Sequence, residues 1–219
     1  MFDIQKKIKT FLSSIMFPSS ETIARIERMS PEEIKQTLPN KPTSPYPFIS
    51  SLFNYRNDAV RELVSHTKYK GNSILIDSFG ELLQEKLYLK FKDLPPKEAR
   101  VHIIPVPLSK ERLIERGFNQ SELLCRSITK HDREKLFIHS PRLLKRTKNT
   151  PPQTKLGKIA RLKNVKDCFS IPEKEKKNVK GKTIVLVDDV TTTGSTLKEA
   201  RLTLLKAGAN EVFAITLAH

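Results

Sequence analysis

Residues 184–196 read Ile-Val-Leu-Val-Asp-Asp-Val-Thr-Thr-Thr-Gly-Ser-Thr and join an apolar run to two acids and a hydroxyl-rich turn. The four aliphatic residues at 184–187 are typical of a parallel strand that is buried on both faces. Residues 195–207 then predict a helix with an apolar stripe, and Gly208 is suited to end it. The turn between strand and helix therefore lies where open α/β sheets bind their ligands.

This turn has the chemistry of an anion site. The first turn of a helix offers N–H groups and the positive end of the helix dipole. Gly194 lets the backbone approach a ligand closely, and the residues around it supply hydroxyl donors. We therefore expect a phosphate group to be bound by Thr191, Thr192, Thr193, Gly194, Ser195 and Thr196.

Asp188 and Asp189 stand directly before this turn and would repel a bare phosphate. Two adjacent carboxylates are suited to accept hydrogen bonds from sugar hydroxyls, or to lie beside a divalent cation that offsets their charge. The local chemistry therefore indicates a phosphorylated sugar. The structural alternative is an ordinary strand–turn–helix whose two acids are solvated.

The four hydrophobic residues, the two acids and Thr193-Gly194-Ser195-Thr196 resemble the signature with which type I phosphoribosyltransferases bind phosphoribosyl pyrophosphate (PRPP). A P-loop nucleotide hydrolase is excluded, although Gly181-Lys182-Thr183 has the ending of that motif. Lys176 stands where the P-loop requires glycine, and the tripeptide precedes a strand instead of following one.

Further segments narrow the resemblance to one family. The chain from about residue 48 to its C-terminus resembles the ComF family of phosphoribosyltransferase-like proteins. The segments that carry this resemblance are Lys68-Tyr69-Lys70-Gly71, Ile103–Leu108, Arg116-Gly117-Phe118-Asn119-Gln120, Arg146-Thr147-Lys148, Thr150-Pro151-Pro152-Gln153-Thr154 and Arg161–Val165.

The resemblance implies a reaction in which a nitrogen nucleophile displaces pyrophosphate from C1 of PRPP, with Mg²⁺ as cofactor. Because the transition state resembles an oxocarbenium ion, no covalent enzyme nucleophile is needed. Asp188 and Asp189 are the predicted catalytic residues, binding the ribose hydroxyls directly or through Mg²⁺ and its waters. The residues expected to bind pyrophosphate are Val106, Pro107, Leu108, Ser109, Arg116, Lys148 and Arg161.

Two of these assignments have alternatives. The basic segment 146–161 resembles the mobile loop that closes over the reacting centre in related enzymes, and a solvated hairpin is the structural alternative. Arg116 is a candidate ligand-binding residue that is equally suited to cap the helix beginning near Gln120. Asn119 is expected to be structural.

The chain is predicted to consist of an N-terminal appendage with a proline-rich linker, residues 1–47, and a phosphoribosyltransferase-like domain, residues 48–219. Residues 1–17 have helical spacing and are expected to pack on the protein or a partner, with a membrane-surface helix as the alternative. Ser30 followed by Pro31 predicts a helix start. ComF proteins usually carry four zinc-binding cysteines in this region, and here there are none, so no zinc site is expected.

Alternating strands and helices predict an α/β fold of the type I phosphoribosyltransferase class, a mainly parallel twisted sheet with helices on both faces. A small helical and extended appendage precedes it. The expected strands are 48–55, 101–106, 136–138, 184–187 and 211–218, and the expected helices of the domain are 57–70, 74–89, 121–129 and 195–207.

The chain has 219 residues and a formal net charge of +16. Residues 142–182 alone carry 14 Lys and Arg against three acids. Two interpretations stay open: a lysine-rich soluble surface, or a field that attracts pyrophosphate or nucleic acid. Two cysteines cannot form a disulfide framework, and neither a membrane span nor a secretory signal is predicted, so a cytoplasmic location is expected.

Two classes of function follow. The first is a phosphoribosyltransferase that acts on PRPP and an unknown base or amine. The second is a non-catalytic PRPP- or nucleotide-binding accessory protein for single-stranded DNA uptake in natural competence, with competence-machinery proteins as partners. Single-strand binders combine basic grooves with aromatic rings, and the aromatic residues considered for that role are Tyr55, Tyr69 and Phe118.

Overall fold

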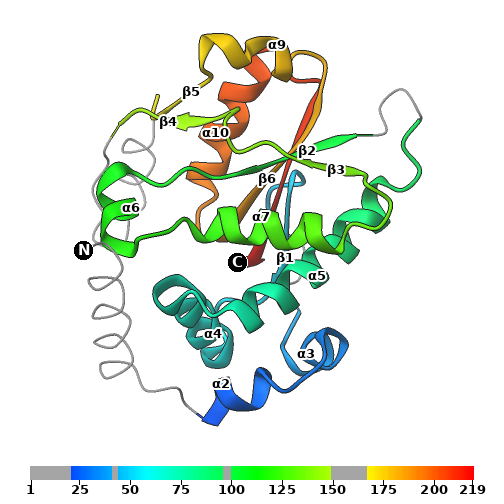
Figure 1. Ribbon diagram of the computed structural model, residues 1–219, viewed down its shortest axis with the longest axis vertical. Helices are drawn as coiled ribbons and strands as arrows, with labels where there is room; N and C mark the ends of the chain where they lie inside the picture. The colour runs from blue at the N-terminus through cyan, green and yellow to red at the C-terminus, as the bar shows by residue number, and fades with distance from the viewer. Residues whose placement is uncertain (1–20, 41–43, 96–99, 149–166) are drawn as a thin grey trace.

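The computed structural model of the chain describes residues 21–40, 44–95, 100–148 and 167–219. A five-stranded sheet forms its centre, and helices cover both of its faces (Figure 1). The strand order is β1-β7-β6-β2-β3, and every neighbouring pair runs parallel. The strands are β1 (Ile49–Phe53), β2 (Val101–Pro105), β3 (Phe137–His139), β6 (Thr183–Val190) and β7 (Glu211–Ala218).

The chain leaves the centre of this sheet in two opposite directions. From β2 it passes to β3 on one side, whereas from β6 it passes to β7 and the β1 edge on the other. Because β2 and β6 are neighbours, the point at which the strand order reverses lies between them. In open α/β sheets, ligands bind in a crevice outside the carboxyl ends of the strands that flank such a reversal. We therefore call the carboxyl ends of β2 and β6 the crevice between β2 and β6.

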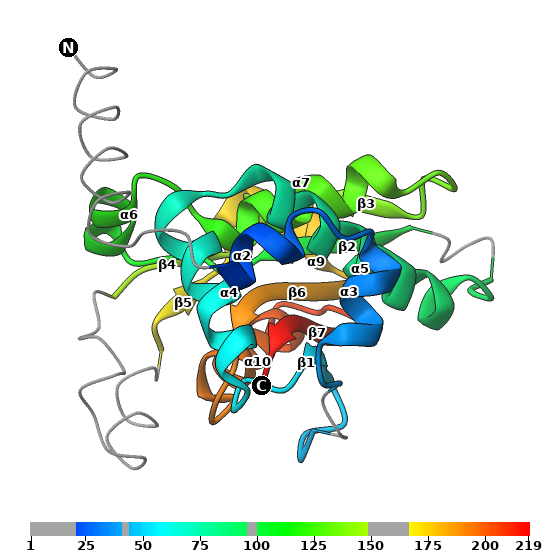
Figure 2. The same cartoon turned by 90° about the horizontal axis from the view of Figure 1, so that it is seen from below.

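Side chains of the central strand alternate between two hydrophobic cores. Val185 and Val187 of β6 belong to one core, and Ile184 and Leu186 belong to the other. A strand covered on both faces must be apolar at every position, which explains the continuous aliphatic run. The first core is completed by α4 (Asp58–Lys70), α5 (Ser73–Phe91) and α7 (Gln120–His131), and the second by α9 (Lys176–Val179) and α10 (Ser195–Lys206) (Figure 2).

The predicted fold class is therefore confirmed. The N-terminal part adds α2 (Glu21–Ile26) and α3 (Pro31–Thr37). As predicted, Ser30 caps α3: its hydroxyl accepts from the N–H of Glu33, whose carboxylate accepts from the N–H of Ser30 at 2.7 Å. Ile23, Ile26 and Ile34 pack into the same core as α4 and α5. The domain boundary at residue 47 stays a prediction.

The predicted elements of residues 48–219 are all present within a few residues of their expected ends. The structure adds short elements that were not predicted: α6 (Lys110–Arg116), β4 (Lys145–Arg146), β5 (Phe169–Ser170), the 3₁₀ turn η3 (Glu173–Glu175) and α9. The ribbon of β4 and β5 is antiparallel and lies outside the main sheet. The helix predicted over residues 1–17 lies outside the described residues.

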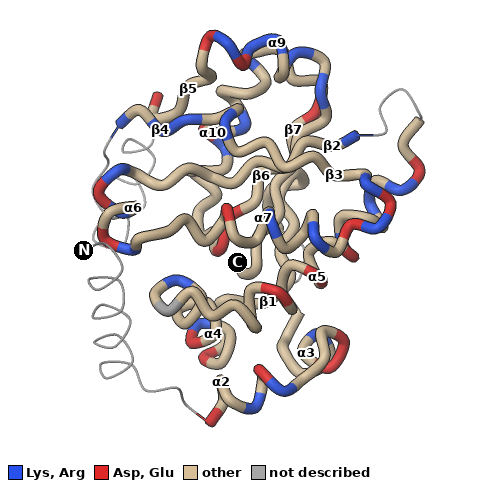
Figure 3. The backbone as a smooth tube through the Cα atoms, in the orientation of Figure 1, with Lys and Arg blue, Asp and Glu red and all other residues tan. Residues whose placement is uncertain are grey.

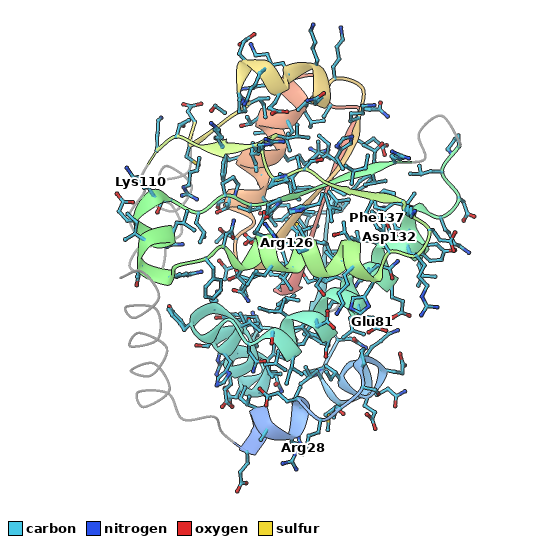
Figure 4. All side chains as sticks on the ribbon, in the orientation of Figure 1. Arg28, Glu81, Lys110, Arg126, Asp132 and Phe137 are labelled. Carbon is cyan, nitrogen blue, oxygen red and sulfur yellow. The ribbon has the colours of Figure 1, made fainter. Side chains whose placement is uncertain are left out.

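Two further features help to orient the molecule. Asp132 ends α7 and accepts the N–H of Phe137 at 2.7 Å, which closes the turn into β3; both residues are labelled in Figure 4. Lys and Arg gather along α9 at the end of the molecule farthest from α2 (Figure 3).

In the part of the chain that the structure describes, no helix is both long enough and apolar enough to cross a bilayer.

Candidate functional site

The predicted pyrophosphate turn and the predicted catalytic acids meet at the crevice between β2 and β6. Pro105 pairs with Val187 in the parallel ladder, and the N–H of Val106 donates to the carbonyl oxygen of Val187 at 2.9 Å. Residues 106–109 therefore adjoin Asp188, although the two segments are far apart in the sequence. Ligands of open α/β sheets bind at such a reversal of strand order.

Asp188 is held by hydrogen bonds in a poorly solvated position. Its Oδ1 accepts from Ser121 Oγ at 3.1 Å and from the N–H of Asp189 at 2.9 Å. Burial raises the pKa of Asp188 from 3.8 to about 7, and the negative charge of Asp189 acts in the same direction. These hydrogen bonds and the charge of Lys68 oppose that rise without cancelling it.

Asp189 has a cationic partner instead. Lys68 Nζ, from the end of α4, lies 3.1 Å from Asp189 Oδ2, and both side chains are largely shielded from solvent. The other oxygen, Oδ1, accepts from the N–H of Val190 at 2.6 Å. The two neighbouring acids therefore differ: one is paired with a lysine, and the other holds a proton more readily than a normal carboxyl.

The hydroxyl-rich turn leads directly into α10. Gly194 adopts φ +69° at the N-cap position and has no side chain to cap the helix. Thr193 Oγ1 lies 2.7 Å from Ser195 Oγ, so two hydroxyls converge beside the helix start. Thr191 is anchored by its N–H to the carbonyl oxygen of Ala218 at 3.1 Å. The turn thus presents hydroxyl groups and a helix N-terminus together, which suits an anion.

The turn at residues 106–109 is shaped by the two helices that follow it. Ser109 caps α6 by accepting the N–H of Arg112 at 3.4 Å. Asn119 caps α7 by accepting the N–H of Ser121, and its Nδ2 donates to the carbonyl oxygen of Val106 at 3.1 Å. Asn119 therefore has the structural role that was predicted for it. The Arg116 guanidinium lies 5.6 Å from the ring centre of Tyr69 in α4, and the cap that was its alternative role is supplied by Asn119.

The start of the basic segment also reaches this crevice. Arg146 lies in β4, and its guanidinium is 5.5 Å from the ring centre of Phe169 in β5. Burial lowers the pKa of Arg146, and Arg112 lowers it further, whereas Asp188 raises it, so these three charges lie within electrostatic range of one another. Lys148 follows, and its carbonyl oxygen accepts from Arg146 Nε at 3.4 Å. Arg161 lies outside the described residues.

Comparisons with known proteins agree with this geometry. A family model described as "Phosphoribosyl transferase domain" matches residues 143–219. Competence protein ComFC of Bacillus subtilis is 34% identical over 158 residues, covering 72% of this chain and 58% of that protein. Competence protein F of Haemophilus influenzae is 34% identical over 160 residues, covering 68% of this chain and 63% of that protein.

The chain belongs to the ComF family of phosphoribosyltransferase-like proteins. A further relative, DNA utilization protein YhgH of Escherichia coli O157:H7, is 38% identical over 113 residues, covering 50% of this chain and 45% of that protein. This ComF-family chain thus spans 45% to 63% of the length of these three relatives. A solved structure, glutamine PRPP amidotransferase from B. subtilis complexed with ADP and GMP, matches with a TM-score of 0.41 and 17% identity, covering 69% of this chain and 30% of that one.

This ComF-family chain has five histidines and two cysteines. Among the described residues, no three His, Cys, Asp or Glu side chains gather in a way that would hold a metal ion. Its two cysteines, Cys125 and Cys168, are both unpaired and buried.

Several residues of the crevice were not predicted as site residues. Lys68 lies in a family-like segment, and Arg146 lies both in such a segment and at the start of the predicted mobile loop, but neither was predicted to bind a ligand, nor were Arg112 and Ser121. The pairs that place Lys68 and Ser121 at the site join α4 and α7 to β6. Such contacts leave no local spacing in the sequence. Unlike Lys68 and Arg146, Arg112 and Ser121 lie outside the family-like segments.

Proposed function

We propose that this protein binds PRPP together with Mg²⁺ and transfers its phosphoribosyl group to a nitrogenous acceptor, releasing pyrophosphate. The observation that carries this proposal is the crevice between β2 and β6. There the acid pair, the hydroxyl-rich start of α10 and the turn at residues 106–109 lie around one point of the sheet. The acceptor is a base or amine that the sequence does not identify.

Each part of the crevice has a distinct role in this proposal. The 5′-phosphate binds at residues 191–196, where hydroxyls and the N-terminus of α10 favour an anion. The ribose hydroxyls donate to Asp188 and Asp189. The pyrophosphate lies at the turn 106–109, and Arg116, Lys148 and Arg161 provide positive charge for it.

The residues present fit a magnesium ion that arrives with its substrate. Mg²⁺ is usually bound by one or two carboxylates, with waters and phosphate oxygens completing its coordination. Asp188 and Asp189 provide that number of carboxylates, and burial of Asp188 favours a cation beside it. When bound, the ion neutralises pyrophosphate charge; the protein groups position the sugar and exclude water.

The reaction is a substitution at C1 of the ribose. The nitrogen of the acceptor forms a bond to C1, the bond from C1 to the pyrophosphate oxygen breaks, and its electron pair leaves with pyrophosphate. The acceptor nitrogen then loses a proton. The protein stabilises the separated charges because its cationic and acidic groups are held in place before the reaction begins.

Calorimetry with PRPP and Mg²⁺, followed by an assay of pyrophosphate release with a panel of bases and amines, tests this proposal. We expect Asp188→Asn and Asp189→Asn each to weaken PRPP binding at least about tenfold. Asp93→Asn is the matched control, because Asp93 is exposed near the end of α5. If PRPP does not bind the unmodified protein, the proposal is wrong.

A second candidate function is a non-catalytic PRPP-binding accessory role in the uptake of single-stranded DNA, together with competence-machinery proteins. The names of the relatives, which refer to competence and DNA utilization, favour it, as does the charge of +16. It predicts PRPP binding without pyrophosphate release. It also predicts DNA affinity that falls steeply with salt and weakens when Lys148, Lys155, Lys158 and Arg161 are neutralised together.

The cellular location belongs to the same proposal. We place the protein in the cytoplasm, because Cys125 and Cys168 remain thiols, as is normal in a reducing compartment. PRPP and nucleobases are intracellular metabolites, so both proposed functions are consistent with a cytoplasmic location.

A further inference from the structure

A cavity of about 330 Å³ lies at the β1 edge of the sheet. Its walls come from β1 and the residues just before it, from the later part of α5, and from the middle of β7. Because β1 is an edge strand, this cavity is separated from β2 by β7 and β6. We call it the β1-edge cavity.

The lining of the β1-edge cavity combines aromatic rings with positive charge. Three rings, Tyr46, Phe48 and Phe213, and two lysines, Lys86 and Lys90, contribute to it. None of the described residues that line it is acidic, although serines of β1 add hydroxyl groups. Lys90 Nζ lies 4.1 Å from the ring centre of Phe213, so charge and ring are already in contact.

Lys86 is the most informative member of this lining. Its Nζ donates to the carbonyl oxygen of Ser51 at 2.8 Å, and it forms no salt bridge with any residue that the structure describes. Burial lowers the pKa of Lys86, and the nearby charge of Lys35 lowers it further. A poorly solvated ammonium without an acidic partner is costly, and an anionic ligand would remove this cost.

The rings are held from outside the cavity. Lys198 Nζ lies 3.8 Å from the ring centre of Tyr46, and the Arg201 guanidinium lies 4.8 Å from that of Phe48. Both cations belong to α10, and neither lines the cavity. The two rings are 6.2 Å apart. They are therefore fixed by α10 and by each other, which makes them preorganised surfaces for a flat apolar ligand.

We propose that the β1-edge cavity binds a nucleotide unit, that is, an aromatic base that carries a phosphate. The rings would contact the base, and Lys86 and Lys90 would bind the phosphate. The volume lies at the lower end of the range of about 300–1,000 Å³ for small-molecule sites, so it accommodates one unit and not several. The same chemistry is offered by a free nucleotide and by one unit of a single strand. This site does not depend on PRPP binding at the β2–β6 crevice.

Calorimetry on the full chain with thymidine monophosphate, thymidine and deoxyribose 5-phosphate tests the proposal. Thymidine monophosphate is expected to bind more tightly than either fragment, because it alone engages rings and lysines together. Lys90→Glu reverses an exposed charge and should weaken thymidine monophosphate binding about tenfold. Phe48→Ala should act in the same direction, with circular dichroism confirming that it folds.

Two comparisons make the outcome decisive. Lys177→Glu makes the same charge change on an exposed residue of α9 and should alter the affinity less than about twofold. Asp188→Asn should leave it unchanged, which separates this site from the PRPP site. Equal losses in Lys90→Glu and Lys177→Glu, or no binding of thymidine monophosphate, would overturn the proposal. Competition by a short oligothymidylate strand would identify strand binding as the source, and its absence would identify the free nucleotide.

Discussion

At the scale of single residues, the two neighbouring acids of β6 behave differently because their surroundings differ. Asp189 is compensated by Lys68, whereas Asp188 lies in a site where burial disfavours its charge. A carboxyl that keeps its proton in the folded state is unusual outside functional sites. The proposed ligand, a metal–diphosphate complex with ribose hydroxyls, would stabilise the charged form of Asp188.

The pKa of Asp188 predicts how stability depends on pH. The folded protein holds this proton up to about pH 7, whereas the unfolded chain loses it near the ordinary value of 3.8. The free energy of unfolding should therefore fall as pH rises between these two values, by on the order of 1–3 kcal/mol from this residue. Asp188→Asn should remove that loss and be more stable than the natural protein at pH 7, as measured by urea unfolding across this range. An unchanged pH dependence in Asp188→Asn would contradict the assignment.

Gly194 offers a second prediction at this scale. A Cβ placed on it would lie 2.8 Å from Tyr46 Cε2 and 3.2 Å from Ile49 Cδ1, and its φ of +69° strains any other residue. Gly181 has a similar φ of +71° but open space around it. We expect Gly194→Ala to destabilise the protein by about 1–3 kcal/mol more than Gly181→Ala, as measured by urea unfolding. Equal losses of stability in Gly194→Ala and Gly181→Ala would show that the Tyr46 side chain can move aside at no measurable cost.

At the scale of elements, α7 connects the core to the crevice. It carries Ser121, which donates to Asp188, and it packs against α5 where Gly80 faces Ser127. A Cβ on Gly80 would overlap the side chain of Ser127, so the glycine permits this close approach of the two helices. The position of the acid pair therefore depends on how closely α5 and α7 pack.

Gly80→Ala tests that dependence. Alanine is a better helix former than glycine by about 1 kcal/mol, so an exposed position would gain stability. Here we expect a net loss of about 1–3 kcal/mol because the helices must separate. Adding Ser127→Gly should recover most of that loss, and a double-mutant cycle with urea unfolding measures the coupling. Additive effects of the two substitutions would show that the helices do not meet at these residues.

The elements that could be predicted are those whose signals are local. β6 was recognisable because a strand covered on both faces is aliphatic throughout, and the start of α3 because Ser30 and Glu33 form a capping box. α6 was not predicted because none of its residues is buried, so its sequence lacks the apolar stripe by which a helix is recognised. β4 and β5 pair across a long intervening segment with two residues each. The part of the candidate site that could be predicted is the part formed by one continuous stretch of sequence, residues 188–196.

The parts of the site that come from other elements could not be predicted in the same way. Lys68 belongs to α4 and meets Asp189 only because α4 and β6 are brought together by the fold. The rings predicted for single-strand binding are Tyr55, Tyr69 and Phe118. The rings of the β1-edge cavity are instead Tyr46, Phe48 and Phe213, which only the fold brings together. Contacts between distant segments follow from packing, which a single sequence does not display.

At the scale of the whole molecule, the N-terminal helices share a core with the sheet. Ile23, Ile26, Ile34 and Leu38 are buried in the same cluster as residues of β2, β6 and β7. Lys35 of α3 also contacts Glu85 of α5 at 2.9 Å. This packing predicts that the described part of the N-terminal region unfolds together with the sheet and not before it.

Ile34→Ala tests this prediction, since Ile34 is fully buried in α3. Removing its side chain should cost about 2–5 kcal/mol. If α3 and the sheet form one cooperative unit, the slowest amides of β6 and β7 exchange only when the whole unit unfolds. The free energy of unfolding calculated from their hydrogen exchange should then fall by the same amount as the free energy measured by urea unfolding. Gln36→Ala, on the exposed face of the same helix, should leave those amides unchanged. Acceleration confined to α2 and α3 would instead mean that these helices open independently of the sheet, as an appendage would.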